Sequence, residues 1–187
     1  MEKIDPRVVR TRKLIMESFI ELAMRKEFKD ITIKDITSAA TVNRATFYDH
    51  FLDKYDLLDK VLEENVMSSL LGEMSTHEAL NKEMLQELFL AVIHFQKALS
   101  TRCQRSYEAF KPKIEEITKK KLQEVFFSLL QKEHPTLENA SLNMRAIILS
   151  WGLYGTVVDY FSQSSMNPID YFQQAIPLLL TQPLLAG

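Results

Sequence analysis

Glycine and cysteine are both scarce in this sequence, and their scarcity excludes several kinds of site. The 187 residues include four glycines, six prolines and one cysteine, Cys103. So few glycines leave no phosphate-binding loop, dinucleotide fingerprint or nucleophile elbow, because each needs glycines at fixed spacing. One cysteine excludes an intrachain disulfide framework and a zinc cluster, and it fits a reducing compartment. With little glycine or proline to break helices, the composition predicts an all-α chain.

Other absences narrow the function classes further. The sequence has no run of about 18 apolar residues, so no membrane span is expected, and its first residues lack the apolar core of a signal peptide. The four histidines have no metal-ligand spacing, and the carboxylates are scattered along charged helix faces. We therefore expect no catalytic residues, no metal site and no cofactor.

The charge is divided unevenly along the chain. Residues 1–54 hold eleven basic and nine acidic side chains, a net +2, whereas residues 55–187 hold twelve and sixteen, a net −4. The asymmetry has the sign expected for a nucleic-acid partner but is small. A local basic face must therefore carry any DNA affinity. The leading end, Arg7 to Lys13, is either a solvated cationic turn or an arm that contacts DNA.

The run from Thr32 to Lys54 has the pattern of two short helices separated by a tight break. Thr32 is a good N-cap for a helix over residues 33–40, whose apolar residues recur at helical spacing. Asn43 caps a second helix over residues 44–51, in which Phe47 and Phe51 lie four apart on one face. By spacing alone, the run fits a surface hairpin as well as a helix-turn-helix unit, whose second helix enters the major groove of DNA.

The order of residues in this run resembles the DNA-binding domain of the tetracycline-repressor (TetR/AcrR) family. The most specific part is Thr46-Phe47-Tyr48, His50-Phe51 and Lys54, preceded by Ile31-Thr32-Ile33 and Val42-Asn43. The resemblance covers roughly residues 8 to 60. Two positions depart from the usual pattern, since Glu27 and Thr41 stand where many members have glycine. Loss of a residue that tolerates positive φ predicts strain at these breaks.

The resemblance implies an all-α fold of about nine helices. Residues 1–54 would form a homeodomain-like, three-helix DNA-binding domain, and residues 55–187 a helical domain for effector binding and dimerisation. The implied function is a homodimeric transcription regulator of the bacterial cytoplasm, associated with the nucleoid, that binds a palindromic operator in double-stranded DNA. It would be a repressor released when a small molecule binds. A helical adaptor, or a regulator with no effector pocket, is the alternative.

Base chemistry and the matching family positions suggest the DNA contacts. Arg44 is expected to pair with guanine, and Asp49 to accept a hydrogen bond from cytosine. Ala45 is small enough for close approach, and Thr46 can reach a thymine methyl group or a phosphate. The residues expected at the phosphate backbone are Thr32, Tyr48, His50 and Lys54. Asn43, the cap of the second helix, belongs to the same DNA-binding set. Phosphate contacts set the register of the protein and not its sequence preference.

Helical patterns follow at 54–74, 78–99, 101–110, 112–133, 138–163 and 168–181, with Pro112, Pro135 and Pro168 as boundaries. The last two helices are too apolar for one exposed face, which predicts either a four-helix dimer interface or internal core. The interface residues expected are Trp151, Gly152, Gly155, Val158, Phe172, Ile176 and Leu179. An effector pocket, with plain core packing as its alternative, would be lined by Met67, Leu70, Phe89, His94, Phe95, Tyr107, Phe110, Phe126, Trp151 and Tyr154.

Overall fold

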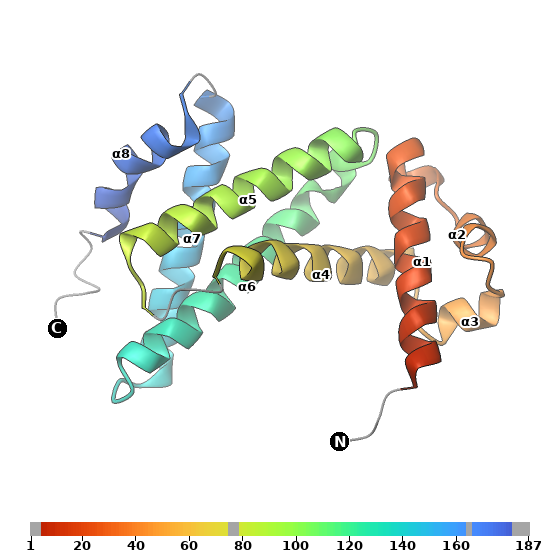
Figure 1. Cartoon of the computed structure of the whole chain (residues 1–187), viewed down its shortest axis with the longest axis horizontal. Helices are drawn as coiled ribbons and strands as arrows, with labels where there is room; N and C mark the ends of the chain where they lie inside the picture. Colours follow the sequence, from red (N-terminus) through yellow and green to blue (C-terminus); the bar gives the residue numbers. More distant parts are fainter. Residues whose placement is uncertain (1–4, 75–78, 164–165, 181–187) are drawn as a thin grey trace. The chain divides into compact units, whose positions relative to one another are not determined.

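The computed structural model describes residues 5–74, 79–163 and 166–180, and every regular element in them is helical, as the sequence predicts. These ranges contain eight α-helices and one 3-10 turn, where about nine helices were expected. The elements, as labelled in Figure 1, are α1 (Pro6–Arg25), η1 (Phe28–Asp30), α2 (Ile33–Ala39), α3 (Arg44–Tyr48), α4 (Lys54–Met74), α5 (Lys82–Arg102), α6 (Tyr107–Glu133), α7 (Asn139–Gln163) and α8 (Pro168–Leu180).

The predicted helix boundary at Pro112 is wrong, because α6 runs through this proline. The break lies earlier, in the turn between α5 and α6, where the Ser106 amide donates to the Cys103 carbonyl oxygen at 2.9 Å. Pro112 is close to the start of α6. Because proline has no backbone N–H, the helix lacks one hydrogen bond at this position. Phe110 and Ile114 are both buried on the same helix, and their packing favours an uninterrupted α6.

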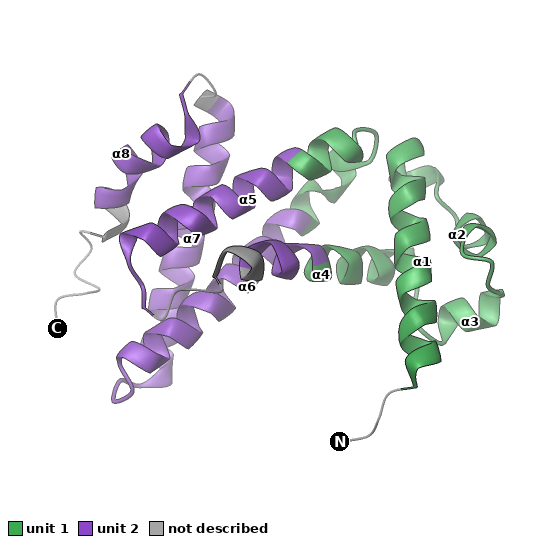
Figure 2. Cartoon of the chain, viewed as in Figure 1, with its two compact units in different colours: residues 1–64, 98–113 green, residues 65–97, 114–187 purple. Residues whose placement is uncertain are grey.

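The chain divides into two compact units (Figure 2). The first comprises residues 1–64 and 98–113, and the second comprises residues 65–97 and 114–187. The division falls within α4, later than the domain boundary predicted at residue 54. It also groups the end of α5 and the start of α6 with the N-terminal helices, although these segments are far apart in the sequence.

The first unit is built on a small aromatic core. Phe19 of α1, Phe28 of η1 and Phe110 of α6 are buried, and the Phe28 ring centroid lies 6.1 Å from Phe19 and 5.4 Å from Phe110. Phe47 and Phe51, in α3 and directly after it, are also buried, with their centroids 5.8 Å apart. Edge-to-face and tilted ring pairs at these distances add to the stabilisation from burial. Together these side chains hold α2 and α3 to the long α1.

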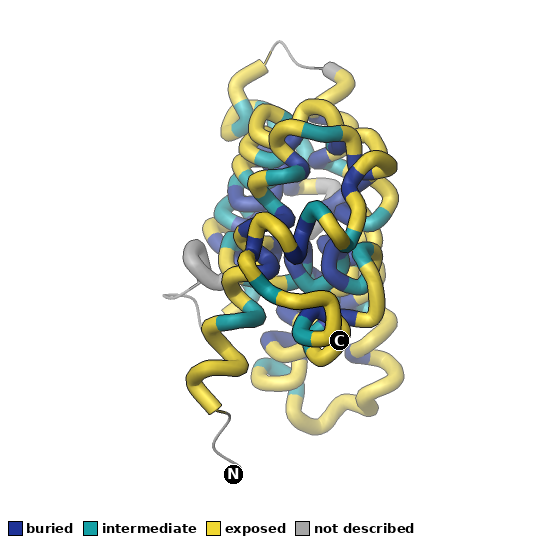
Figure 3. The backbone as a smooth tube through the Cα atoms, turned by 90° about the vertical axis from the view of Figure 1, so that its right-hand side faces the viewer, coloured by how far each residue is buried: buried dark blue, intermediate teal, exposed yellow. Residues whose placement is uncertain are grey.

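The second unit packs α5 to α8 around a separate core. Phe89 of α5 stacks on Phe172 of α8, with centroids 4.7 Å apart, and both rings are fully buried. Tyr171 donates a 2.7 Å hydrogen bond to the Asp159 carboxylate, joining α8 to α7. Burial, together with this hydrogen bond, raises the pKa of Tyr171 to about 12. In Figure 3 the buried and exposed residues alternate along the helices, as expected when each helix presents one face to a core.

Candidate nucleic-acid interface

The first helix of the two-helix unit, α2, begins with a capping box. The amide of Asp35 donates to Thr32 Oγ1 at 3.1 Å, and the amide of Thr32 donates to Asp35 Oδ2 at 2.9 Å. These reciprocal bonds satisfy two backbone N–H groups that the helix would otherwise leave unpaired. The bonds from the Thr32 amide and hydroxyl, together with the nearby ammonium of Lys26, lower the pKa of Asp35 to about 2. The N-cap predicted at Thr32 is therefore confirmed.

The break between α2 and α3 contains a residue in the left-handed region. Thr41 has φ 54°, and its amide donates to the Ser38 carbonyl oxygen at 3.3 Å. A β-branched side chain in this region is strained, as its substitution for glycine predicts. Glu27 differs, because its φ of −68° lies in the ordinary extended region and does not require glycine. The strain expected from the two departures is thus present at Thr41 and not at Glu27.

Helix α3 presents an arginine and a tyrosine on its exposed face. Asn43 Oδ1 accepts a 2.7 Å hydrogen bond from the Thr46 amide, which confirms the predicted cap, and Phe47 is fully buried. The cap and the buried ring orient Arg44 and Tyr48 outward. The Arg44 guanidinium lies over the Tyr48 ring, 5.6 Å from its centroid, and Nη2 donates to the Tyr48 hydroxyl at 3.2 Å. This stacked pair gives α3 a flat, positively charged surface.

The other residues predicted on α3 differ in exposure. Ala45 and Asp49 are exposed, while Thr46 and His50 are half-buried. Helix α3 ends at Tyr48, earlier than the predicted residue 51, and Asp49 is its C-cap. The described hydrogen bond from the Arg44 guanidinium goes to the Tyr48 hydroxyl.

The Lys54 side chain points into the protein. Its Nζ donates to three backbone carbonyl oxygens in or beside η1, those of Phe28 at 3.0 Å, Lys29 at 3.2 Å and Ile31 at 2.9 Å. An ammonium has three protons, and these three bonds use all of them. The phosphate contact predicted for Lys54 has no support in this geometry.

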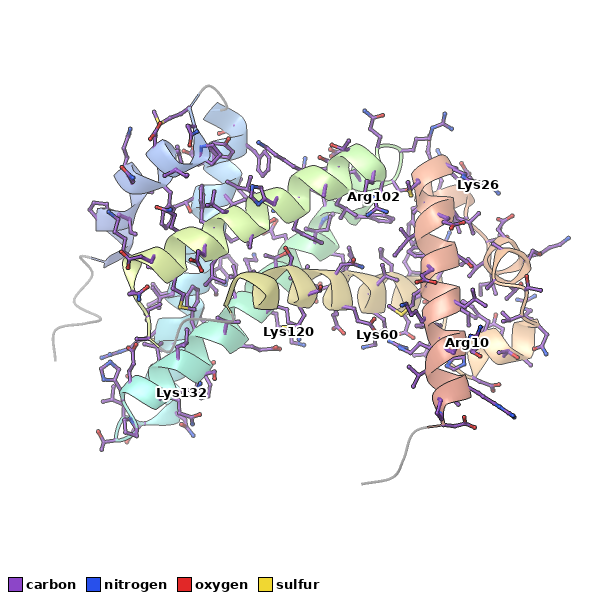
Figure 4. All side chains as sticks on the ribbon, viewed as in Figure 1. Arg10, Lys26, Lys60, Arg102, Lys120 and Lys132 are labelled. Atoms are coloured by element: carbon purple, nitrogen blue, oxygen red, sulfur yellow. The ribbon has the colours of Figure 1, made fainter. Side chains whose placement is uncertain are left out.

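The basic residues at the start of α1 also differ in whether they are exposed or bonded to other parts of the protein. Arg7 and Arg10 are exposed, whereas Arg12 lies over the Phe51 ring at 4.8 Å and pairs with Glu64 at 3.1 Å. Arg10 is labelled in Figure 4, near the start of α1. The sequence shows that these residues are basic, but it does not show that Arg12 contacts Glu64 of α4 and Phe51 after α3, because both partners are far away in the chain.

The residues predicted for the effector pocket do not form one site. Tyr107 and Phe110 belong to the first unit, and Phe110 packs in its aromatic core. In the second unit His94 and Trp151 are exposed, Met67 and Phe95 are half-buried, and the fully packed members are Leu70, Phe89, Phe126 and Tyr154. A surface depression described in this unit is lined by other residues: Gln123, Glu124, Phe127, Asn139, Ala140 and Asn143.

The residues predicted for the dimer interface fall into two groups. Trp151 and Val158 of α7 are 59% and 51% exposed, and Gly155 is exposed between them. Gly152 is half-buried. Phe172 and Ile176 of α8 are buried within the protomer, so neither side chain is exposed for a partner. Phe172 stacks on Phe89 of α5, so this side of α8 covers the core of its own unit. The side chain of Leu179 lies outside the described residues.

A capped pair of short helices, with the second presenting a stacked arginine and tyrosine, defines a helix-turn-helix DNA-binding unit. Residues 15–61 match the family model described as "Bacterial regulatory proteins, tetR family". The chain therefore contains the DNA-binding domain of this family, whose members are transcription regulators and not enzymes. Among the described residues no helix is long and apolar enough to cross a membrane, and no cluster of metal-ligating side chains occurs.

Two curated regulators are similar to this chain over part of its length. An uncharacterized HTH-type regulator of Bacillus subtilis (strain 168), YxbF, is 34% identical over 100 residues, 53% of this chain and 26% of that protein. The dhaKLM operon activator DhaS of Lactococcus lactis subsp. lactis (strain IL1403) is 29% identical over 75 residues, 40% of each chain. The chain thus spans less than half of either relative.

Among solved structures, the multidrug binding protein EbrR, complexed with imidazole, has a TM-score of 0.61 and 16% identity, with 94% of this chain and 98% of that chain covered. At this identity, the likeness establishes the fold alone.

Proposed function

We propose that this chain is a homodimeric, sequence-specific transcription regulator of the bacterial cytoplasm, a repressor that leaves a palindromic operator when a small molecule binds. The observation that carries the proposal is the placement of Arg44. It is exposed in the first turn of α3, the helix that follows the turn, and a side-chain cap and a buried phenylalanine fix its position. The first turn of the second helix is the part that meets base edges in the major groove.

The proposed roles of the α3 residues follow from their chemistry and exposure. Arg44 donates two hydrogen bonds to guanine O6 and N7, and exposed Ala45 allows the helix to approach closely. Thr46 contacts a thymine methyl group or a phosphate, and Asp49 accepts from cytosine N4. The residues assigned to phosphates are Thr32, Tyr48 and His50. Lys54 is left out of this set because its ammonium is bonded to backbone carbonyl groups.

The dimer interface is proposed on α7 alone. Large apolar side chains are exposed along one face of this helix, at spacings of three, four and seven residues: Met144, Ile147, Ile148, Trp151 and Val158. A Cβ added at Gly155, on the same face, would meet no atom within 4 Å, which leaves room for a partner helix. A contiguous apolar face of this length favours a covered interface. The exposed residues described on α8 are mixed instead: Asp170, Gln173 and Gln174 are polar, and Ile169 and Pro177 are apolar.

Effector binding is proposed for the core of the second unit, where polar groups are enclosed. Gln96 is buried and donates from Nε2 to the Tyr154 hydroxyl at 3.4 Å. Thr118 Oγ1 is buried, and none of the described residues bonds to it. Polar groups in an apolar core are candidates for orienting a small ligand. EbrR, a multidrug binding protein, has the same fold, and its structure contains imidazole.

The experiment that tests the function is selection of bound sequences from a random DNA duplex pool, followed by gel shifts at two salt concentrations. A regulator should enrich a palindrome, lose affinity as salt rises and keep its sequence preference. A helical adaptor would enrich nothing. A transcription assay with the selected operator then determines the sign, since DhaS is by name an activator, and a compound screen seeks the molecule that abolishes binding.

A further inference from the structure

The segment that joins α1 to α2 is held by a side chain from α4. Residues 26–32 contain only the short turn η1, and three of their carbonyl groups, at Phe28, Lys29 and Ile31, point toward one ammonium. This ammonium belongs to Lys54, the first residue of α4. The three oxygens lie 2.9–3.2 Å from Nζ, so each backbone dipole contributes a charge-assisted hydrogen bond.

Aromatic rings complete the surroundings of the Lys54 ammonium. Nζ lies 4.8 Å from the centroid of the Phe28 ring and 5.7 Å from that of Tyr55. The two rings contact each other edge to face at 5.3 Å. Ring faces attract a cation, and here they add to the carbonyl bonds. Phe28 is itself buried against Phe19 and Phe110, so the ammonium is tied to the core of the first unit.

The held segment leads directly into the helix-turn-helix unit. Ile31, whose carbonyl oxygen accepts a hydrogen bond from Lys54, directly precedes Thr32, and Thr32 is the N-cap of α2. The position of the Ile31 carbonyl group therefore fixes where α2 begins. Helix α2 in turn packs beside α3, which presents Arg44.

We propose that Lys54 is a positioning residue for DNA reading, which sets the start of α2 through the turn at residues 28–31 and touches no phosphate. The inference rests on the proposed function in that it concerns the same DNA-binding surface. To reach a phosphate, the ammonium would have to give up three hydrogen bonds and its ring contacts. Asp53 and Asp56, within two residues of Lys54 in the sequence, cap the start of α4, and their carboxylates disfavour a phosphate there.

The salt dependence of binding distinguishes positioning from phosphate contact. Each phosphate contact contributes about 0.9 to the slope of log affinity against log salt, or about 1.8 for two copies in a dimer. Lys54→Met keeps the apolar stem and removes the ammonium. We expect it to lower affinity for the selected operator by about tenfold with the slope unchanged. Lys29→Met is the charge-matched control, because Lys29 is exposed and its ammonium pairs with Glu27.

A second measurement, on the free protein, does not depend on DNA. The Asp30 and Ile31 amides donate to Glu27 and Phe28 carbonyl oxygens, and their hydrogen exchange should accelerate in Lys54→Met but not in Lys29→Met. Circular dichroism identifies conditions in which all variants are folded, and Lys54→Gln serves if Lys54→Met is not. A slope reduced by about 1.8 in Lys54→Met, or unchanged affinity and exchange in the folded variant, would overturn the proposal. Failure of the parent to bind any duplex would instead contradict the proposed function.

Discussion

Ser106 donates a 2.8 Å hydrogen bond from Oγ to the backbone carbonyl oxygen of Lys26, 80 residues earlier in the chain. Beside it, Arg105 donates from Nη1 to the carbonyl oxygen of Arg25 at 3.2 Å. Both acceptors are at the C-terminus of α1, where a helix leaves carbonyl groups without partners. The turn between α5 and α6 therefore caps the helix on which the DNA-reading helices pack, and the first unit is incomplete without residues 98–113.

Ser106→Ala should destabilise the first unit. Ser106 is fully buried, so its loss leaves the Lys26 carbonyl group without this donor, at a cost of about 1–2 kcal/mol in the free energy of unfolding. Urea unfolding followed by circular dichroism measures the change. Ser128→Ala, at an exposed position of α6, is the control and should stay within about 0.5 kcal/mol of the parent. Equal stability of Ser106→Ala and the parent would contradict the capping role.

Acid should weaken the cap of α2. The hydrogen bonds from Thr32 and the ammonium of Lys26, whose Nζ is 3.1 Å from Oδ1, lower the pKa of Asp35 to about 2 from 3.8. Figure 4 labels Lys26, just beyond the end of α1. A carboxyl group whose pKa is lower in the folded state stabilises the fold above its unfolded pKa. That contribution is lost as pH falls from about 4 through about 2.

The measurement for this prediction compares the free energy of unfolding of the parent and of Asp35→Asn. The parent should be the more stable near pH 7, and the difference should shrink between about pH 4 and about pH 2. A difference that does not change over this interval would show that the Asp35 carboxylate is not responsible.

Local features of this fold could be predicted from the sequence, and partners distant in the chain could not. The caps at Thr32 and Asn43 depend on hydrogen bonds to residues three positions away, so the residue types suffice to predict them. Lys54 is different. The sequence places it at the start of a helix, but its acceptors are 23–26 residues away and are backbone groups, which leave no pattern in the sequence.

The same reason explains the errors in the C-terminal half. Helical spacing shows that Phe110 and Phe172 are buried, but spacing does not show what they are buried against. Phe110 packs on Phe28 in the first unit, and Phe172 stacks on Phe89 in the second. One was predicted to line a pocket and the other a dimer interface. Either prediction would have required knowing which helices are neighbours. This depends on contacts between segments far apart in the chain, which helical spacing does not show.

Replacing Thr41 with glycine should stabilise the protein. Thr41 has φ 54°, where a side chain with a Cβ is strained by about 1–2 kcal/mol. Glycine relieves this strain but loses more entropy on folding, so the expected net gain is about 0.5–1 kcal/mol in the free energy of unfolding. Ala39→Gly, at the end of α2, is the control and should lower stability. A loss of stability in both variants would contradict strain at Thr41.

Arg44→Ala should weaken DNA binding and relax sequence preference at one base position in each half-site. A bidentate contact to guanine contributes about 1–3 kcal/mol of discrimination. Tyr48→Phe is the matched control, because it removes the hydroxyl that accepts from Arg44 and keeps the ring under the guanidinium. Selection from a random duplex pool compares the base preferences of the three proteins. If Arg44→Ala selects the same consensus with the same stringency as the parent, Arg44 reads no base.

Trp151→Glu should convert the proposed dimer into monomers. Trp151 is 59% exposed on the apolar face of α7, and Lys119 Nζ, which pairs with Glu115, lies 3.6 Å from its ring centroid. A carboxylate at position 151 would be solvated in a monomer but desolvated in a symmetric interface, where it would also compete with Glu115 for the ammonium. The folded protomer should therefore persist, while affinity for a palindromic operator falls by at least about a hundredfold because two half-sites are no longer bound together. Sedimentation velocity measures the oligomeric state. Gln173→Glu, at an exposed position of α8, should remain dimeric. A dimeric Trp151→Glu variant would place the interface on another surface.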